Sequence, residues 1–157
     1  MNDEIFAINT VEVLQHFFLS ILGDSFDPAD IKKEKAHKKH KFDTAIYIGV
    51  YGDIEGMLLL ETQQSAAKEL ARLISCSSGQ EISLNELVKN YIGELGNIIM
   101  TKTIALCDKA FGDSYLSTPS VFIGSDIQVN LFYKISHSVV INTPFGTLRL
   151  TFAVKEG

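Results

Sequence analysis

Residues 83–111 read SLNELVKNYIGELGNIIMTKTIALCDKAF, and this stretch decides the fold class more than any other part of the chain. Ser83 and Glu86 fit a capping box, in which the serine hydroxyl accepts a hydrogen bond from the Glu86 amide while the glutamate reaches back. Lys109 near the end and Gly112 just after it are typical of a helix C-terminus. Between these signals, apolar residues recur with a helical period: Leu84, Leu87, Val88, Tyr91, Ile92, Leu95, Ile98 and Ile99. The stretch therefore predicts one long capped helix over about residues 83–111.

The flanking sequence predicts two shorter helices and a set of strands. The helices are expected over residues 9–23 and 63–75, the second with these side chains facing inward: Ala66, Ala67, Leu70 and Leu73. A hairpin is expected over residues 42–62, with Gly52 and Asp53 as its turn. Further strands are expected over residues 120–124, 127–135, 137–141 and 148–154. Alternating polar positions favour antiparallel pairing, so the predicted fold class is α+β, an antiparallel sheet with helices layered on it. A helix followed by a hairpin occurs twice, which is compatible with a two-fold organisation.

The length and composition of the chain are those of a globular domain. Its 157 residues, 46% hydrophobic and 21% charged, are expected to form a single domain over residues 1–157. No apolar run reaches the ~20 residues that span a bilayer, and the acidic start lacks the basic segment of a signal peptide. Cys76 and Cys107 are far apart and predict two reduced, buried thiols. We therefore expect a cytoplasmic protein with no membrane partner.

The positive charge of the chain is concentrated in one segment. The net charge is -5, but residues 32–41 hold six lysines and one glutamate, which gives this lysine window a charge of +5. The remaining 8 basic and 18 acidic residues give -10. No aromatic residue interleaves the lysines, and nucleic-acid bases stack on aromatic side chains, so a nucleic-acid partner is not expected. Two interpretations stay open, a solvated sheet edge or loop, or a docking patch for an acidic protein.

The common catalytic and metal-binding motifs are missing from the sequence. It contains no HExxH, GxSxG, paired CxxC, P-loop or dinucleotide fingerprint. His37 and His40 are spaced at i, i+3, but lysines flank them closely, whereas metal-binding imidazoles are usually backed by carboxylates. We therefore expect no metal site.

The long helix carries a polar pair away from its buried stripe. At 100° per residue, Asn97 lies about 160° and Glu94 about 100° from Leu95, on the same side. The two side chains are therefore neighbours at i, i+3, and Glu86, Asn90 and Thr101 extend the same strip. From the residues alone, this strip is either an ordinary solvated face or a functional one.

Two glycines flank the polar pair. A glycine inside a helix lowers the stability of the helix by ~1 kcal/mol relative to alanine. The presence of Gly93 and Gly96 therefore calls for a structural or functional explanation. One reason is close packing against another element of the same chain. The other is the approach of a partner's backbone, in which case Gly93 belongs to a binding surface.

These motifs resemble those of a known family. Residues 94–99, ELGNII, are similar to the ExxN helix of the chemotaxis phosphatase family that contains CheC, CheX and FliY, and most of all to its CheX-like members. Residues 117–124, STPSVFIG, resemble the Pro-strand-Gly segment that follows this helix in the family. The length and the order of elements also match, so the resemblance covers nearly the whole chain. It departs at residues 100–102, MTK, where family members often carry small or polar residues.

The resemblance implies a CheC/CheX-like fold and a phosphatase that removes the aspartyl phosphate of a CheY-type response regulator. Asn97 would orient the attacking water, and Glu94 would pair with the regulator's lysine. The partner-binding residues would be Glu94, Asn90, Gly93 and Thr101. The regulator brings its own aspartate, lysine and Mg²⁺, so no cofactor of this chain's own is expected. The resemblance further implies a homodimer formed through sheet edges.

Some family members have two sites, with a second ExxN on the first helix. The corresponding stretch here is Glu12-Val13-Leu14-Gln15, so the resemblance implies one site, and a second site at Glu12 and Gln15 stays open. An alternative function is a non-catalytic module, related to the flagellar switch proteins, that docks a receiver domain without hydrolysis. The pathway could also be a two-component system other than chemotaxis, with identical chemistry.

Overall fold

The computed structural model describes most of the chain. The described residues are 3–23, 27–34, 42–75, 86, 90, 93–106, 112–125 and 135–154. Several predictions therefore lie outside the described residues, wholly or in part: the His37 and His40 pair, Ser83 of the capping box, the long helix over 84–92 except Glu86 and Asn90, its end over 107–111, the strand over 127–135 except Ile135, and the two cysteines.

The described helices are α1 (Asp3–Leu22), α2 (Gln64–Ser75), α4 (Gly93–Leu106) and the short 3₁₀ helix η2 (Pro28–Asp30). Helix α4 confirms the central part of the predicted long helix. Helix α1 begins at Asp3, so the predicted start at residue 9 is wrong. Its first residues, Asp3 and Glu4, are acidic, and negative charge stabilises a helix N-terminus. Gly23, with a φ of 56°, follows the end of α1, as predicted.

The described strands form one seven-stranded antiparallel sheet. They are β1 (Ile31–Glu34), β2 (Thr44–Gly52), β3 (Gly56–Thr62), β4 (Ser114–Leu116), β5 (Ser120–Ile123), β6 (Ile135–Thr143) and β7 (Gly146–Val154). The order across the sheet is β1-β6-β7-β3-β2-β4, and β5 pairs with β2 as well. This architecture confirms the α+β class and the antiparallel sheet.

The sheet has a two-fold organisation. Each half of the chain supplies a helix, one or two short outer strands and a hairpin: α1, β1 and β2–β3 in the first half, and α4, β4/β5 and β6–β7 in the second. The outer strands are exchanged, because β1 pairs with β6 while β4 and β5 pair with β2. Strands β3 and β7 join the halves at the centre. The repeated helix-and-hairpin order in the sequence reflects this arrangement.

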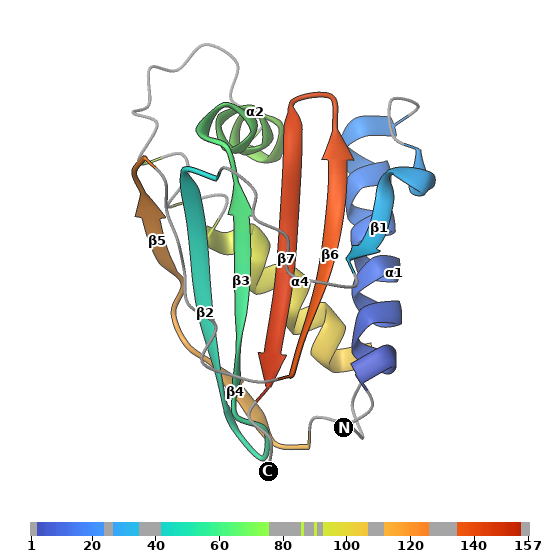
Figure 1. Cartoon of the computed structure of the whole chain (residues 1–157), viewed down its shortest axis with the longest axis vertical. Coiled ribbons are helices and arrows are strands. Elements are labelled where there is room, and N and C mark those ends of the chain that lie inside the picture. The colour runs from blue at the N-terminus through green and yellow to red at the C-terminus, as the bar shows by residue number, and fades with distance from the viewer. Residues whose placement is uncertain are drawn as a thin grey trace.

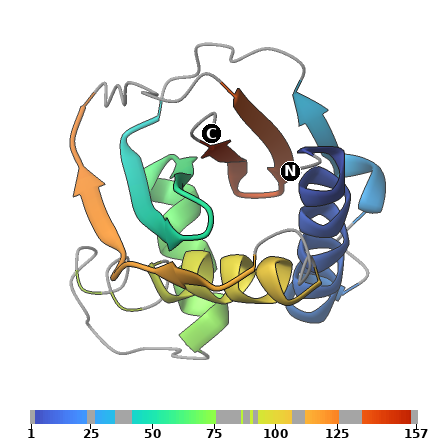
Figure 2. The same ribbon diagram turned by 90° about the horizontal axis from the view of Figure 1, so that it is seen from below.

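The helices α1 and α4 cover the same face of the sheet (Figure 1). Helix α4 packs on β2 and β3, α1 packs on β1 and β6, and the two helices also contact one another. Seen from below, they meet at one corner of the molecule (Figure 2). The main core lies between these helices and the sheet, and its buried side chains include Leu14, Phe18, Ile48, Leu60, Leu70, Leu95, Ile99, Leu150 and Phe152.

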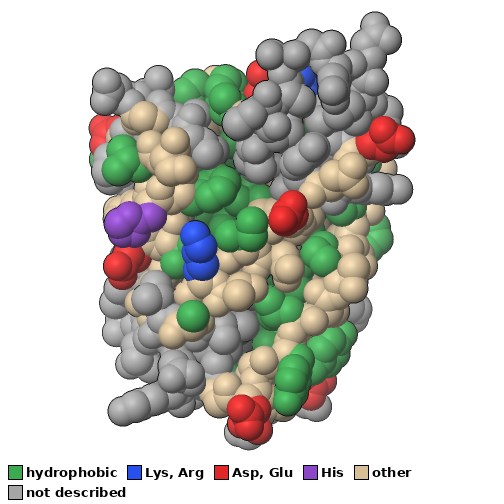
Figure 3. All heavy atoms as spheres, turned by 180° about the vertical axis from the view of Figure 1, so that it is seen from behind, with side chains coloured by type: hydrophobic (Ala, Val, Ile, Leu, Met, Phe, Trp, Pro, Cys, Tyr) green, Lys and Arg blue, Asp and Glu red, His purple; other side chains and the backbone are tan. Residues whose placement is uncertain are grey.

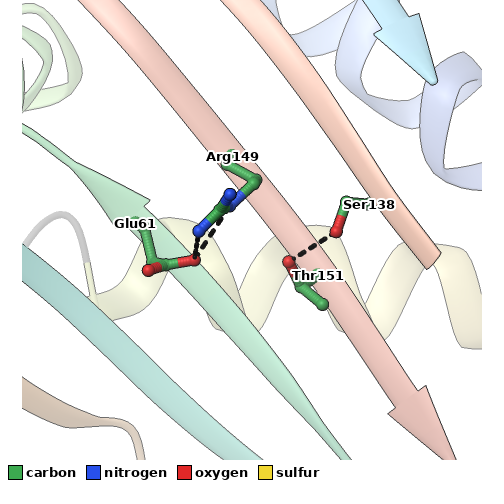
Figure 4. Close-up of polar contacts among 4 residues, drawn as sticks. All are labelled: Glu61, Ser138, Arg149 and Thr151. Carbon is green, nitrogen blue, oxygen red and sulfur yellow. Dashed lines mark hydrogen bonds and ion pairs between the residues drawn. The ribbon is translucent and has the colours of Figure 1, made fainter. Parts of the chain in front are cut away.

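The opposite face of the sheet holds a smaller apolar cluster and a buried ion pair. The cluster consists of Ala45, Met57, Leu59 and Ala153, with Tyr47 against it. The Arg149 Nε and Nη2 atoms lie 3.0 and 2.9 Å from Glu61 Oε1, and the two side chains are only 3% and 5% exposed (Figure 4). The guanidinium also lies 5.1 Å from the centre of the Phe42 ring, within cation–π range.

Several details of the prediction need correction. The hairpin turn consists of residues 53–55, and Gly52 is the last residue of β2, so the predicted two-residue turn of Gly52 and Asp53 is wrong. Asp53 is held by Asp113, just before β4: the Asp53 amide donates to the Asp113 carbonyl, and the Asp113 amide donates to Asp53 Oδ2. In α2, Leu73 is exposed and Ala71 is buried in its place. Strands β1 and β4 were not predicted.

Strand β1 accounts for the start of the lysine window. Lys32 and Lys33 lie on this strand and are exposed, and in the described residues β1 pairs only with β6. These two lysines therefore lie on a solvated sheet edge, while residues 35–41 are outside the described part. None of the described helices is both long and apolar enough to cross a membrane.

Candidate functional site

Helix α4 presents one stripe to the sheet and the opposite side to solvent. Leu95 and Ile99 are buried in the core, and Thr103 is buried one turn further on. The Thr103 hydroxyl donates to the Ile99 carbonyl at 2.8 Å, so its polar group is satisfied within the helix. Burial of this stripe determines how α4 is oriented about its own axis. It therefore also determines which side chains of α4 face solvent.

Glu94 and Asn97 lie on that outer side. Glu94 is exposed and Asn97 is partly exposed, which agrees with the geometry expected from the helical period. Among the described residues, the Glu94 carboxylate and the Asn97 side-chain amide have no hydrogen-bond or ion-pair partner. A carboxylate and a carboxamide thus stand one helical turn apart on a packed helix, available to another molecule.

Close packing within the chain explains Gly96, whereas a side chain at Gly93 would make only ordinary contacts. A side-chain carbon at Gly96 would lie 3.3 Å from Ile48 Cδ1 and 3.8 Å from Ile46 Cγ2 of β2. One at Gly93 would lie 3.6 Å from Pro119 Cβ and 3.8 Å from Val121 Cγ2. Gly93 is buried, and the atoms nearest to it belong to its own chain. It therefore does not lie on a surface that a partner could contact.

The segment after β4 holds the start of α4. Ser117 is bound to Gly49 of β2 twice: its amide donates to the Gly49 carbonyl at 2.9 Å, and its Oγ accepts from the Gly49 amide at 2.7 Å. Pro119 then reaches Gly93, and β5 pairs with β2. The STPSVFIG segment therefore contacts both the sheet and the start of the helix that carries Glu94 and Asn97, and it connects the two.

The other two predicted contact residues are also exposed. Asn90 precedes Glu94 by four positions and is exposed. Thr101 follows Asn97 by one turn, and its hydroxyl donates to the Asn97 carbonyl at 2.8 Å. The structure therefore brings Glu94, Asn97 and Thr101 to one solvent-facing side of α4, and Asn90 is exposed as well.

The chain matches the sequence model of a known protein family. The family model described as "Chemotaxis phosphatase CheX" matches residues 44–143, which include the ELGNII and STPSVFIG segments. The chain belongs to the CheX family. No curated protein sequence matches it.

Solved structures share the CheX-family fold over nearly the whole chain. CheX from the CheX–CheY complex of Borrelia burgdorferi has a TM-score of 0.77 at 18% identity, covering 98% of this chain and 97% of that one. A CheC-like superfamily protein from a Shewanella species has a TM-score of 0.78 at 18% identity, covering 99% and 100%. The FliM middle domain from Vibrio alginolyticus is less similar, with a TM-score of 0.57 at 11% identity, covering 95% and 90%.

In this CheX-family chain, α1 carries the stretch that could form a second site. Glu12 is exposed and Gln15 is partly exposed, the same pattern as Glu94 and Asn97 on α4. The placement leaves the second site open, and the residue type, glutamine in place of asparagine, still favours one site. Among the described residues, no three His, Cys, Asp or Glu side chains gather as a metal site would require.

One feature beside the site was not predicted. Lys102 is seven positions after Leu95, so the helical period puts it within about 20° of the buried stripe. It is nevertheless exposed, because α1 and α4 leave a groove of about 520 Å³ between them at this point. A groove between two helices distant in sequence leaves no signal in either helix alone.

Proposed function

We propose that this chain hydrolyses the aspartyl phosphate of a CheY-type response regulator. The observation that carries the proposal is the Glu94–Asn97 pair, exposed side by side on α4 in a chain of the CheX family. The Borrelia burgdorferi CheX of similar fold was solved in a complex with CheY, BeF₃ and Mg²⁺, which supports a CheY-type partner for this chain.

Asn97 would orient the attacking water. A carboxamide can accept a hydrogen bond from water through its oxygen and donate one to a phosphoryl oxygen through its NH₂ group. The water oxygen bonds to phosphorus in line with the breaking P–O bond, and the regulator's aspartate leaves as a carboxylate. Both water hydrogens remain with the phosphate, as H₂PO₄⁻. Phosphoryl transfer of this kind relies mainly on positioning and electrostatics, which one oriented side chain can provide.

Glu94 would fix the docked orientation. Its carboxylate is expected to pair with the lysine of the receiver's active site, while Asn90 and Thr101 contact the surface around it. The Mg²⁺ and the phosphorylated aspartate belong to the partner, so this chain needs no cofactor of its own for the reaction. The proposal assigns the protein to the cytoplasm, together with its substrate.

The test is a phosphate-release assay with a panel of phosphorylated receiver domains and Mg²⁺. Asn97→Ala is expected to fold and to bind the receiver, but to hydrolyse about a hundredfold more slowly, the usual loss of ~3 kcal/mol for an oriented polar group. Asn142→Ala is the matched control, because Asn142 is an exposed asparagine on the β6–β7 hairpin. If Asn97→Ala hydrolysed at the wild-type rate, the assignment of Asn97 would be wrong.

The same assay separates the enzyme from the alternative function. A non-catalytic module related to the flagellar switch proteins would bind receiver domains and release no phosphate. The exposed carboxylate and carboxamide favour the enzyme, since docking alone does not require that pair of groups.

We also propose that the protein forms a homodimer through a sheet edge. In the described residues, β5 pairs only with β2, so its other side is an edge that a second copy could join. Sedimentation at micromolar concentration should give the mass of a dimer, and a monomer mass would exclude it.

A further inference from the structure

We infer that the groove between α1 and α4 is a second contact site for the docked receiver domain, which inserts an apolar side chain there. This inference rests on the proposed function and adds to it the part of the interface that selects the regulator. Its basis is the position, lining and charge of the groove.

The groove has an apolar lining and a charged rim. Val13 and Phe17 of α1 and Ala105 of α4 line it, with a volume of about 520 Å³. Its polar lining residues include Glu12 and His16 from α1 and Lys102 from α4, all exposed. The face of the molecule seen from behind shows hydrophobic side chains between acidic, basic and histidine side chains (Figure 3). An apolar centre with a polar rim is the usual anatomy of a protein–protein contact.

The groove falls within reach of a partner docked on the catalytic pair. Lys102 and Ala105 follow Asn97 by five and eight positions, which is ~7.5 and ~12 Å along the helix axis and about 140° and 80° around it. At a side-chain radius of about 5.5 Å, these offsets put the two positions ~13 and ~14 Å from Asn97. A specific interface covers roughly 800 Å² per partner, equivalent to a disc of radius ~16 Å. Two polar side chains occupy only a small part of such an area. A receiver domain seated on Glu94 and Asn97 would therefore extend over the neighbouring surface of α4, where the groove opens.

The charged residues at the rim of the groove determine which groups of the receiver domain can bind beside it. Glu12 on one wall favours a basic group of the partner, and Lys102 on the other favours an acidic group. The occupant is therefore an apolar side chain flanked by charges of both signs on the receiver surface. Complementary rim charges of this kind mainly set partner choice and association rate.

The experiment fills the groove without removing a core contact. Ala105→Leu adds bulk from an exposed position, and Ala29→Leu, at an exposed alanine in η2, is the matched control. Ala105→Leu should raise the KM for the phosphorylated receiver about tenfold, with kcat within twofold of wild type. The Kd for the receiver loaded with BeF₃ and Mg²⁺ should rise by the same factor. Ala29→Leu should change none of these values.

A charge variant tests the rim independently. Lys102→Glu should slow association with the BeF₃-loaded receiver about fivefold at low salt, and the difference should shrink at high salt. Lys68→Glu on α2 is the control and should associate at the wild-type rate.

The outcomes separate this inference from the proposed function. If wild type binds and hydrolyses but Ala105→Leu matches Ala29→Leu in KM and Kd, only the groove assignment is wrong. If Ala105→Leu changes the sedimentation of the protein alone and leaves the KM unchanged, the occupant is a second copy of this chain, and the inference is overturned. If wild type neither binds nor hydrolyses any receiver, both proposals fall together.

Discussion

Glu94 is the residue whose removal should separate docking from chemistry. A hydrogen-bonded contact to a charged group is worth about 1.5–3 kcal/mol, or roughly one to two powers of ten in affinity. Glu94→Ala should therefore raise the KM for the phosphorylated receiver at least tenfold and also lower kcat, whereas Asn97→Ala should act mainly on kcat. Glu69→Ala is the control, because Glu69 forms only an exposed pair with Arg72 on α2. An unchanged KM for Glu94→Ala would exclude the pairing with the receiver's lysine.

The buried pair of Glu61 and Arg149 makes a prediction about stability. Removing one member leaves an uncompensated buried charge, which destabilises a protein by about 3–5 kcal/mol. Glu61→Ala should lower the free energy of unfolding by that amount, measured by urea denaturation. Glu69→Ala removes a carboxylate from an exposed pair, which is usually worth at most ~1 kcal/mol. A loss below ~1 kcal/mol for Glu61→Ala would show that Arg149 finds other partners or water.

At the scale of single residues, the helical period was sufficient for the centre of α4, but not for Leu73 of α2, which it placed inward and which is exposed. The positions of Leu95, Ile99, Glu94 and Asn97 follow from one helical period, and the structure agrees with all four. It was insufficient for Lys102, whose exposure depends on the distance between two helices.

At the scale of elements, the contact of α4 with the sheet determines how the polar pair is presented. Alanine in place of a helical glycine normally stabilises by ~1 kcal/mol. At Gly96 the added carbon would lie 3.3 Å from Ile48 Cδ1, a tight contact in a packed core, where overpacking costs about 1–3 kcal/mol. At Gly93 the nearest atom is 3.6 Å away, an ordinary contact.

Gly96→Ala should therefore be less stable than Gly93→Ala by about 1–2 kcal/mol, measured by thermal or urea unfolding of the two variants together. Because a displaced α4 moves Asn97 relative to a docked receiver, Gly96→Ala should also lower kcat more than Gly93→Ala does. Equal stability and equal kcat would mean that the closeness of α4 to β2 is not required for the site.

Elements were predictable in proportion to their length and periodicity. Helices α1 and α2 and the two hairpins have strong local patterns and were found. Strands β1 and β4 have four and three residues, and their pairings join positions far apart in sequence, such as Ile31 with Ile141. Strand β5 also pairs with the other half of the chain, but Pro119 and Gly124 bound its apolar run and made it predictable, whereas no such signal bounds β1 or β4.

For the whole molecule, the two-fold sheet raises the question of how many sites it carries. The exchange of outer strands relates α1 to α4, and both helices expose an acid followed by an amide three positions later. The two amides differ by one methylene: Gln15 has a longer, more mobile side chain than Asn97, and a water-positioning group must be held within a fraction of an ångström. We therefore predict that only α4 is active.

Kinetics of three variants decide between one site and two. With a single site, Gln15→Ala should keep kcat within twofold, Asn97→Ala should lower it about a hundredfold, and the double variant should lose no more than Asn97→Ala alone. Two equal sites would instead leave Asn97→Ala with about half of the wild-type rate. The double variant detects a weak second site, which would show as a further drop from the Asn97→Ala rate in protein with an unchanged urea unfolding curve. We therefore expect the number of active helices to depend on one methylene group, the difference between Gln15 and Asn97.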